Sequence, residues 1–107
     1  MVDFMKIMQQ AQQMQGRLQQ VQEELGRLSV TGTAGGGMVT AEADGKGMVR
    51  RVKIDPAVVD PTDIEMLEDL VVAAVGEAQK KAAALAQSKM AELSGGLDLP
   101  LPFKLPI

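Results

Sequence analysis

The feature that most constrains the fold of this sequence is a run of apolar residues whose spacings alternate between three and four. Such spacing places the apolar side chains on one stripe of an α-helix, as in the a and d positions of a heptad repeat. A helix from Asp3 to Leu28 would be about 39 Å long at 1.5 Å per residue, whereas a compact domain of 100 residues has a radius of gyration near 13 Å. We therefore expect a helix over residues 1–28 that projects from the body and needs a packing partner. The stripe comprises Phe4, Ile7, Ala11, Met14, Leu18, Val21, Leu25 and Leu28.

The polar positions of the same segment are mostly glutamines between Met8 and Gln22. One interpretation is a solvated face made of good helix formers. The other is a face that can lie near phosphates without repelling them, because an amide both donates and accepts hydrogen bonds.

Residues 29–55 change to a β pattern. The runs 38–43 and 48–54 are rich in β-forming residues and are joined by Asp44-Gly45-Lys46-Gly47, whose Asp-Gly step is a strong hairpin signal. A third strand is predicted over 29–34. In the last strand, Met48, Arg50, Val52 and Ile54 alternate with more polar neighbours. We therefore expect a three-stranded antiparallel meander that is covered on one side.

A second long helix is predicted over residues 60–94. Asp60-Pro61 supplies an N-cap followed by proline at the first helical position. Its apolar stripe leads towards Lys89, so the far end of this helix is expected to face solvent. Residues 95–107 alternate apolar residues with prolines and predict an extended arm. We favour a strip laid over its own domain or its dimer mate, and the alternative is a docking peptide for another protein.

Composition limits the class of protein. With 107 residues, 46% hydrophobic and 23% charged, the chain should fold as a single domain over residues 1–107. There is no apparent secretory leader or membrane span, so we expect a cytoplasmic protein without a membrane partner. The net charge of −3 gives no global attraction to nucleic acid, so any anion binding must be local.

Nothing in the sequence predicts an active site. The chain has no Cys and no His, which removes the thiolate nucleophile and the commonest general base and metal ligand. The glycine run 32–37 lacks the Lys and Ser/Thr of a phosphate loop and leads into a predicted strand. We therefore expect a non-enzymatic protein without catalytic residues, metal, cofactor or small-molecule substrate.

Nine of the eleven basic residues lie on the first helix, the last strand and the second helix. A DNA-binding protein without sequence preference needs only a few well-placed cations, because each phosphate that is neutralised releases counterions. A dimer would double the set.

Three separated stretches then identify a resemblance. They are GGGMVTAEADGKGMVRRVKIDP at 35–56, EMLEDLVVAAVGEAQKKA at 65–82 and SGGLDLPLPFKLP at 94–106. Together and in this order they closely resemble the YbaB/EbfC family of bacterial nucleoid-associated proteins. The resemblance implies an α+β fold of the order αβββα, a tweezer-like homodimer whose long helices contact duplex DNA, and a place on the nucleoid with an influence on gene expression.

The DNA-contacting helices of that family correspond here to two surfaces. From charge and projection we expect duplex DNA to be held mainly through phosphates, with little base specificity. The alternative is a protein-interaction or chaperone-like module that uses the apolar stripe, the methionines and the proline-rich tail. The predicted DNA-binding residues are Lys6, Gln13 and Arg17 on the first helix and Lys80, Lys81 and Lys89 on the second.

Overall fold

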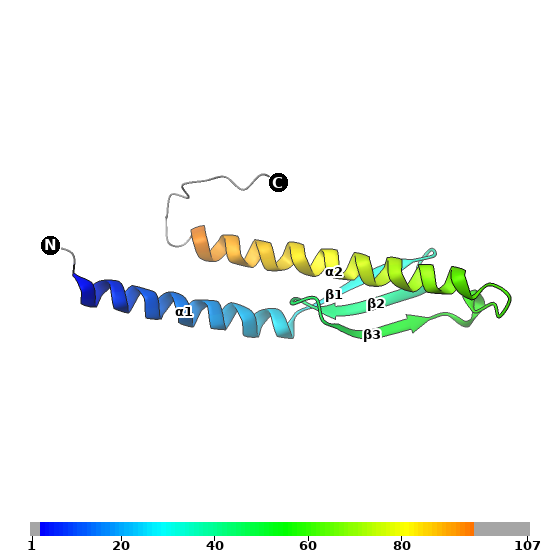
Figure 1. Ribbon diagram of the computed structural model, residues 1–107, viewed down its shortest axis with the longest axis horizontal. Coiled ribbons are helices and arrows are strands. Elements are labelled where there is room, and N and C mark those ends of the chain that lie inside the picture. Colours follow the sequence, from blue (N-terminus) through cyan, green and yellow to red (C-terminus); the bar gives the residue numbers. More distant parts are fainter. Residues whose placement is uncertain (1–2, 96–107) are drawn as a thin grey trace.

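A computed structural model of the chain describes residues 3–95, and Figure 1 shows the order of its elements. Two helices flank a three-stranded antiparallel sheet, so the predicted α+β fold class is confirmed. The extended tail predicted for 95–107 lies outside the described residues, apart from Gly95. The elements are α1 (Phe4–Arg27), β1 (Ser29–Ala34), β2 (Val39–Asp44), β3 (Val49–Ile54), the 3-10 helix η1 (Pro56–Val58) and α2 (Ile64–Gly95).

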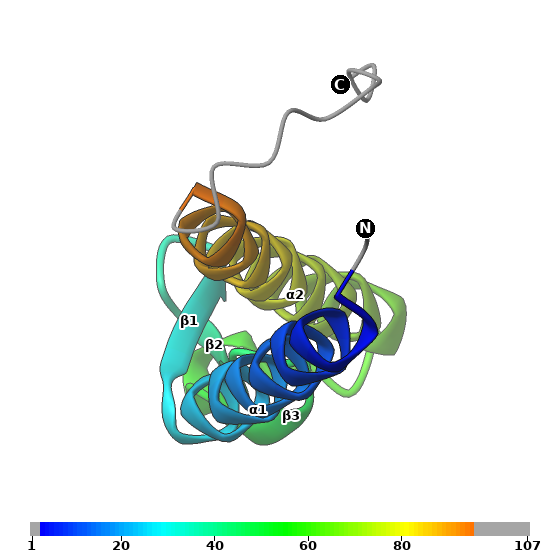
Figure 2. The same cartoon turned by 90° about the vertical axis from the view of Figure 1, so that its left-hand side faces the viewer.

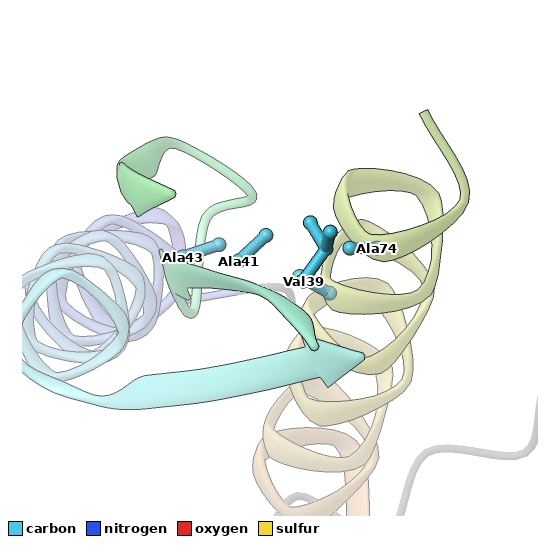
Figure 3. Close-up of a cluster of buried hydrophobic side chains, with 5 residues drawn as sticks. Val39, Ala41, Ala43 and Ala74 are labelled. Carbon is cyan, nitrogen blue, oxygen red and sulfur yellow. The ribbon is translucent and has the colours of Figure 1, made fainter. Parts of the chain in front are cut away.

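Helix α2 covers one face of the sheet, as the alternating pattern predicted. It packs mainly on β1 and β2 and touches β3 much less. Figure 3 shows the side chains of Val39, Ala41 and Ala43 on β2 beside Ala74 of α2. All four are fully buried. Small residues at the centre of this layer let the helix approach the strands closely, and they form the core of the body.

The pairing of β2 with β3 contains a bulge between Glu42 and Ala43. Before the bulge, Ala41 lies opposite Val52, and after it Ala43 lies opposite Val49. Because an extra residue reverses the alternation of faces, Val49 lies on the same face as Val52. The predicted apolar face of this strand was therefore wrong for Met48 and Arg50, because period-2 alternation does not continue through a bulge.

Helix α1 projects from the body, as its length predicted (Figure 1). The molecule measures 73 × 28 × 16 Å and has a radius of gyration of 19.8 Å. Seen along its length, α1 lies beside α2 and at one end of the sheet (Figure 2). Asp3 caps α1 by accepting a hydrogen bond of 3.3 Å from the amide of Lys6, and the helix ends at Arg27 where β1 is about to begin.

Helix α2 begins later than predicted. Asp60 does not cap it but accepts hydrogen bonds from the amide and the hydroxyl of Thr62, at 2.9 and 2.7 Å. Asp63 takes the capping role, since its carboxylate accepts from the amide of Met66 at 3.1 Å. The prediction from Asp60-Pro61 failed because the Asp side chain closes a local turn instead. Among the described residues, neither helix has a stretch apolar and long enough to cross a membrane.

Candidate nucleic-acid interface

The three predicted residues of α1 lie on its projecting part, and all are exposed. Lys6 and Gln13 are seven residues apart and share one stripe of the helix, and Arg17 follows Gln13 by one turn. Figure 1 shows that the N-terminal half of α1 continues past the end of α2. This side of α1 is therefore accessible to a large ligand.

Of the two adjacent lysines of α2, Lys81 reaches the edge strand β1 of the sheet. The ammonium of Lys81 donates a hydrogen bond of 2.9 Å to the carbonyl of Thr31 on β1 and lies 3.1 Å from the carboxylate of Glu77. Lys80 is exposed. Lys81 is therefore held at β1 and not beside the bases of α1.

Lys89 faces α1 instead of solvent. Its ammonium lies 2.7 Å from the carboxylate of Glu24, and its side chain is only 24% exposed. The hydrogen bond and the charge of Glu24 raise the pKa of Lys89 above its ordinary value. Most of this end of α2 faces solvent, as expected, since Gln87, Ser88, Met90, Ala91 and Glu92 are exposed, but Lys89 itself turns towards α1. Lys89 links α2 to α1 through this ion pair, which matches its charge within the chain.

A groove of about 520 Å³ runs between the two helices beside this ion pair. Arg17 and Arg27 of α1 line it together with Glu24, and Arg27 lies 3.8 Å from the carboxylate of Glu23. The sequence analysis did not select Arg27. Its heptad position, fourteen residues after Gln13 on the same stripe, is a signal that would have found it. The lining residues are Arg17, Gln20, Val21, Glu24, Arg27, Leu28 and Leu93.

The C-terminal end of α1, which we call its root, is fixed to the β2–β3 hairpin through Asp44. This carboxylate is 5% exposed and accepts hydrogen bonds from the amides of Lys46 and Met48, at 2.9 and 3.0 Å. The guanidinium of Arg50 lies 3.4 Å from Asp44 and also donates to the carbonyl of Gly26 at the end of α1. Arg50 is the residue that the bulge displaces from regular pairing. This network sets the direction in which α1 leaves the body.

The same network predicts a dependence of stability on pH. The amide of Met48 is the main cause that lowers the pKa of Asp44 from its ordinary value of 3.8, with help from Lys46 and Arg50 and against desolvation. A carboxylate whose pKa is lower in the folded state stabilises the fold above the unfolded pKa, and this contribution disappears as the pH falls through the folded pKa. We expect Asp44→Asn to remove that component, so that urea midpoints of the variant fall less steeply than those of the wild type below about pH 4. Parallel curves for the two proteins would contradict it.

Comparison with known proteins now identifies the family. The family model described as the YbaB/EbfC DNA-binding family matches residues 1–97. The chain belongs to this family. The predicted resemblance is therefore confirmed over both helices and the whole sheet.

Similar curated proteins support the assignment. A nucleoid-associated protein of Gemmatimonas aurantiaca is 52% identical over 105 residues, which cover 98% of this chain and 99% of the relative. A nucleoid-associated protein of Corynebacterium diphtheriae is 51% identical over 96 residues, which cover 90% of this chain and 91% of the relative. An uncharacterized protein of Helicobacter pylori, HP0035, has a crystal structure with a TM-score of 0.71 and 21% identity, covering 91% of this chain and 98% of that one. This last likeness concerns the fold alone.

Proposed function

We propose that this YbaB/EbfC protein is a non-enzymatic, nucleoid-associated protein of the cytoplasm that binds duplex DNA as a homodimer. It holds DNA mainly through phosphates, with little base specificity. The observation that carries the proposal is the membership of a DNA-binding family together with exposed bases on a projecting helix. A chain with a net charge of −3 needs such local placement, because its overall charge repels a polyanion.

The ion pairs of the chain separate the basic residues into two groups. Between described residues there are four salt bridges, and none of them includes Lys6, Arg17 or Lys80. Their charges are available to phosphates. Lys81 and Lys89 are already paired with Glu77 and Glu24, so they must exchange a carboxylate for a phosphate. Gln13 lies between the two bases of α1 and supplies a neutral donor. We therefore propose Lys6, Gln13, Arg17 and Lys80 as the principal contacts, with Lys81 and Lys89 as weaker ones.

The test measures the affinity for a random-sequence duplex by fluorescence anisotropy at several salt concentrations. We expect Lys6→Gln/Arg17→Gln to lower the affinity by roughly tenfold at low salt. The slope of log K against log salt should become shallower by about 0.9 for each phosphate that the variant no longer neutralises. Replacing Lys80 by Gln should weaken binding more than replacing Lys89, whose charge is matched by Glu24.

A matched control is available on the outer face of the sheet, which is the face that points away from α2. Arg51 and Lys53 are exposed there, and Arg51→Gln/Lys53→Gln removes the same charge as the α1 variant. Equal losses for the two double variants would show that only net charge matters and would overturn the assignment to α1. A wild-type protein that fails to bind duplex at low salt would overturn DNA binding itself and favour the protein-interaction alternative.

The dimer proposal rests on apolar surface that α2 leaves uncovered. Val52 and Ile54 of β3 lie opposite Ala41 and Val39, on the face of the sheet that carries α2. They remain 38% and 37% exposed, and Val72 of α2 is 70% exposed. Apolar residues on the inner face of a sheet are normally covered, and a second copy of the chain provides a cover of matching character.

This arrangement predicts the effect of a charge in the uncovered surface. We expect Val72→Glu to shift the protein from dimer to monomer mass in sedimentation equilibrium, because a carboxylate would have to be desolvated at the interface. Val72 is already exposed in the single chain, so far-UV circular dichroism should keep its helical signal. A variant that retains dimer mass at micromolar concentration would place the interface elsewhere. The outer-face variant Lys53→Glu is the control and should remain dimeric.

A further inference from the structure

A polar row runs along α1 and contains its three predicted DNA contacts. Its members are separated by seven, four, three, four and three residues, and such spacings return to the same side of an α-helix. All of its members are exposed. At about 1.5 Å per residue the row is roughly 32 Å long. The polar row comprises Lys6, Gln13, Arg17, Gln20, Glu24 and Arg27.

Only one member of the polar row is negative. Helix α1 has no acidic residue over 4–22, and the single carboxylate of the row belongs to Glu24. If this carboxylate were unmatched, it would repel the phosphates that Arg17 and Arg27 on either side could bind. It is matched, because the ammonium of Lys89 lies 2.7 Å from it. The row therefore carries three positive charges and no uncompensated negative one.

The two members of this ion pair differ in exposure. The side chain of Glu24 is 49% exposed, whereas that of Lys89 is 24% exposed. Lys89 comes from α2, and Glu24 lines the groove between the helices together with Arg17 and Arg27. A large ligand that follows the row therefore meets Glu24 before it meets Lys89.

The row ends in a base that is free to change its partner. The side chain of Arg27 is 77% exposed, and its guanidinium lies 3.8 Å from the carboxylate of Glu23, which is itself 66% exposed. An exposed pair of this kind contributes little to stability, so a phosphate can replace the carboxylate. Arg27 follows Arg17 by ten residues, or about 15 Å. The two arginines are too far apart to share one phosphate.

We infer that the DNA-binding surface of α1 extends along the whole polar row and adds Arg27 to the contacts, while Lys89 acts through Glu24 by cancelling its charge. The weaker effect of Lys89 on binding then comes from its ion pair, and Lys89 is a positioning residue. The inference rests on the proposed binding of duplex DNA and assigns the side of α1 that faces it.

The first test compares two arginines by fluorescence anisotropy with a random-sequence duplex. We expect Arg27→Gln to lower the affinity about threefold at low salt and to make the slope of log K against log salt shallower by about 0.9. The matched control Arg51→Gln removes the same charge from the outer face of the sheet and should change both quantities much less. Equal effects of the two substitutions would overturn the inference.

A charge exchange then separates the roles of Glu24 and Lys89. The variant Glu24→Lys/Lys89→Glu keeps the net charge and keeps opposite charges at the two positions, so α1 stays linked to α2. A positive charge now stands within the row, so the affinity should rise about threefold at low salt. If Lys89 itself binds a phosphate, the exchange puts a carboxylate at that contact and the affinity should fall. Lower or unchanged affinity would overturn the inference.

The neutral variant Glu24→Gln/Lys89→Gln tests the same point without an ion pair that must form again. Its salt slope should equal that of the wild type, because no phosphate contact is lost. A slope shallower by about 0.9 would show that Lys89 binds a phosphate and would overturn the inference. The wild type is titrated alongside every variant. If it binds duplex while these comparisons fail, only the inference is overturned, whereas a wild type that does not bind overturns the proposed function as well.

Discussion

Replacing Gly32 by Ala is expected to cost about 3 kcal/mol or more of folding free energy. Gly32 is buried on β1, where the strand crosses beneath α2. A Cβ at this position would lie 2.2 Å from the carbonyl oxygen of Ala74 and 2.3 Å from the amide nitrogen of Ala78. Backbone atoms cannot turn away as a flexible side chain can. The helix must therefore move off the sheet, and the packing of Ala74 and Ala78 against β2 loosens.

Urea unfolding at a fixed protein concentration measures this effect, since a dimer would make the midpoint depend on concentration. Gly16→Ala is a matched control, because nothing lies within 4 Å of a Cβ at Gly16 and alanine favours helix by about 1 kcal/mol over glycine. We expect the two substitutions to have opposite signs. A Gly32→Ala protein as stable as the wild type would mean that α2 does not pack closely on β1 at this point.

Replacing Gly45 by Ala is expected to detach the root of α1 and to cost about 1 to 3 kcal/mol. The amide of Gly45 donates a hydrogen bond of 2.8 Å to the carbonyl of Leu25. A Cβ on Gly45 would lie 2.7 Å from that carbonyl oxygen and 2.9 Å from Cδ2 of Leu25. The hairpin and the helix must separate, so both this bond and the burial of Leu25 are weakened. Hydrogen exchange should rise in the last turns of α1, and affinity for duplex DNA should fall with it.

Gly26→Ala tests the same junction from the other side. Its Cβ would meet only the flexible end of Lys46, at 3.6 and 3.7 Å, and alanine suits the helix better than glycine. This variant should therefore be as stable as the wild type or more so. If Gly26→Ala were as damaging as Gly45→Ala, general crowding at the hairpin, and not the approach of Leu25, would explain the loss.

The sequence predicted which single residues of the candidate interface are exposed, but it did not predict which of them are paired with a carboxylate. The exposure of Lys6, Gln13 and Arg17 follows from a heptad pattern that places them outside the apolar stripe. Whether a base is available to DNA depends on its partners, and Lys89 finds Glu24 65 residues away in the sequence. No local pattern contains that pairing. The sequence analysis therefore could not show that Lys89 is paired with Glu24, whereas the heptad position of Arg27 is a local signal that the sequence does contain.

The order of helices and strands was determined by the sequence by itself, because periodicity, Asp-Gly turns and prolines act on neighbouring residues. The family followed from three motifs in the same way. The tertiary structure alone decided the bulge that turns Arg50 towards Asp44, the pairing of Lys89 with Glu24, and the close approach of β1 to α2 at Gly32. These features depend on how separate elements share space and hydrogen bonds. These contacts join residues that are far apart in the sequence, so the local preferences of neighbouring residues do not predict them.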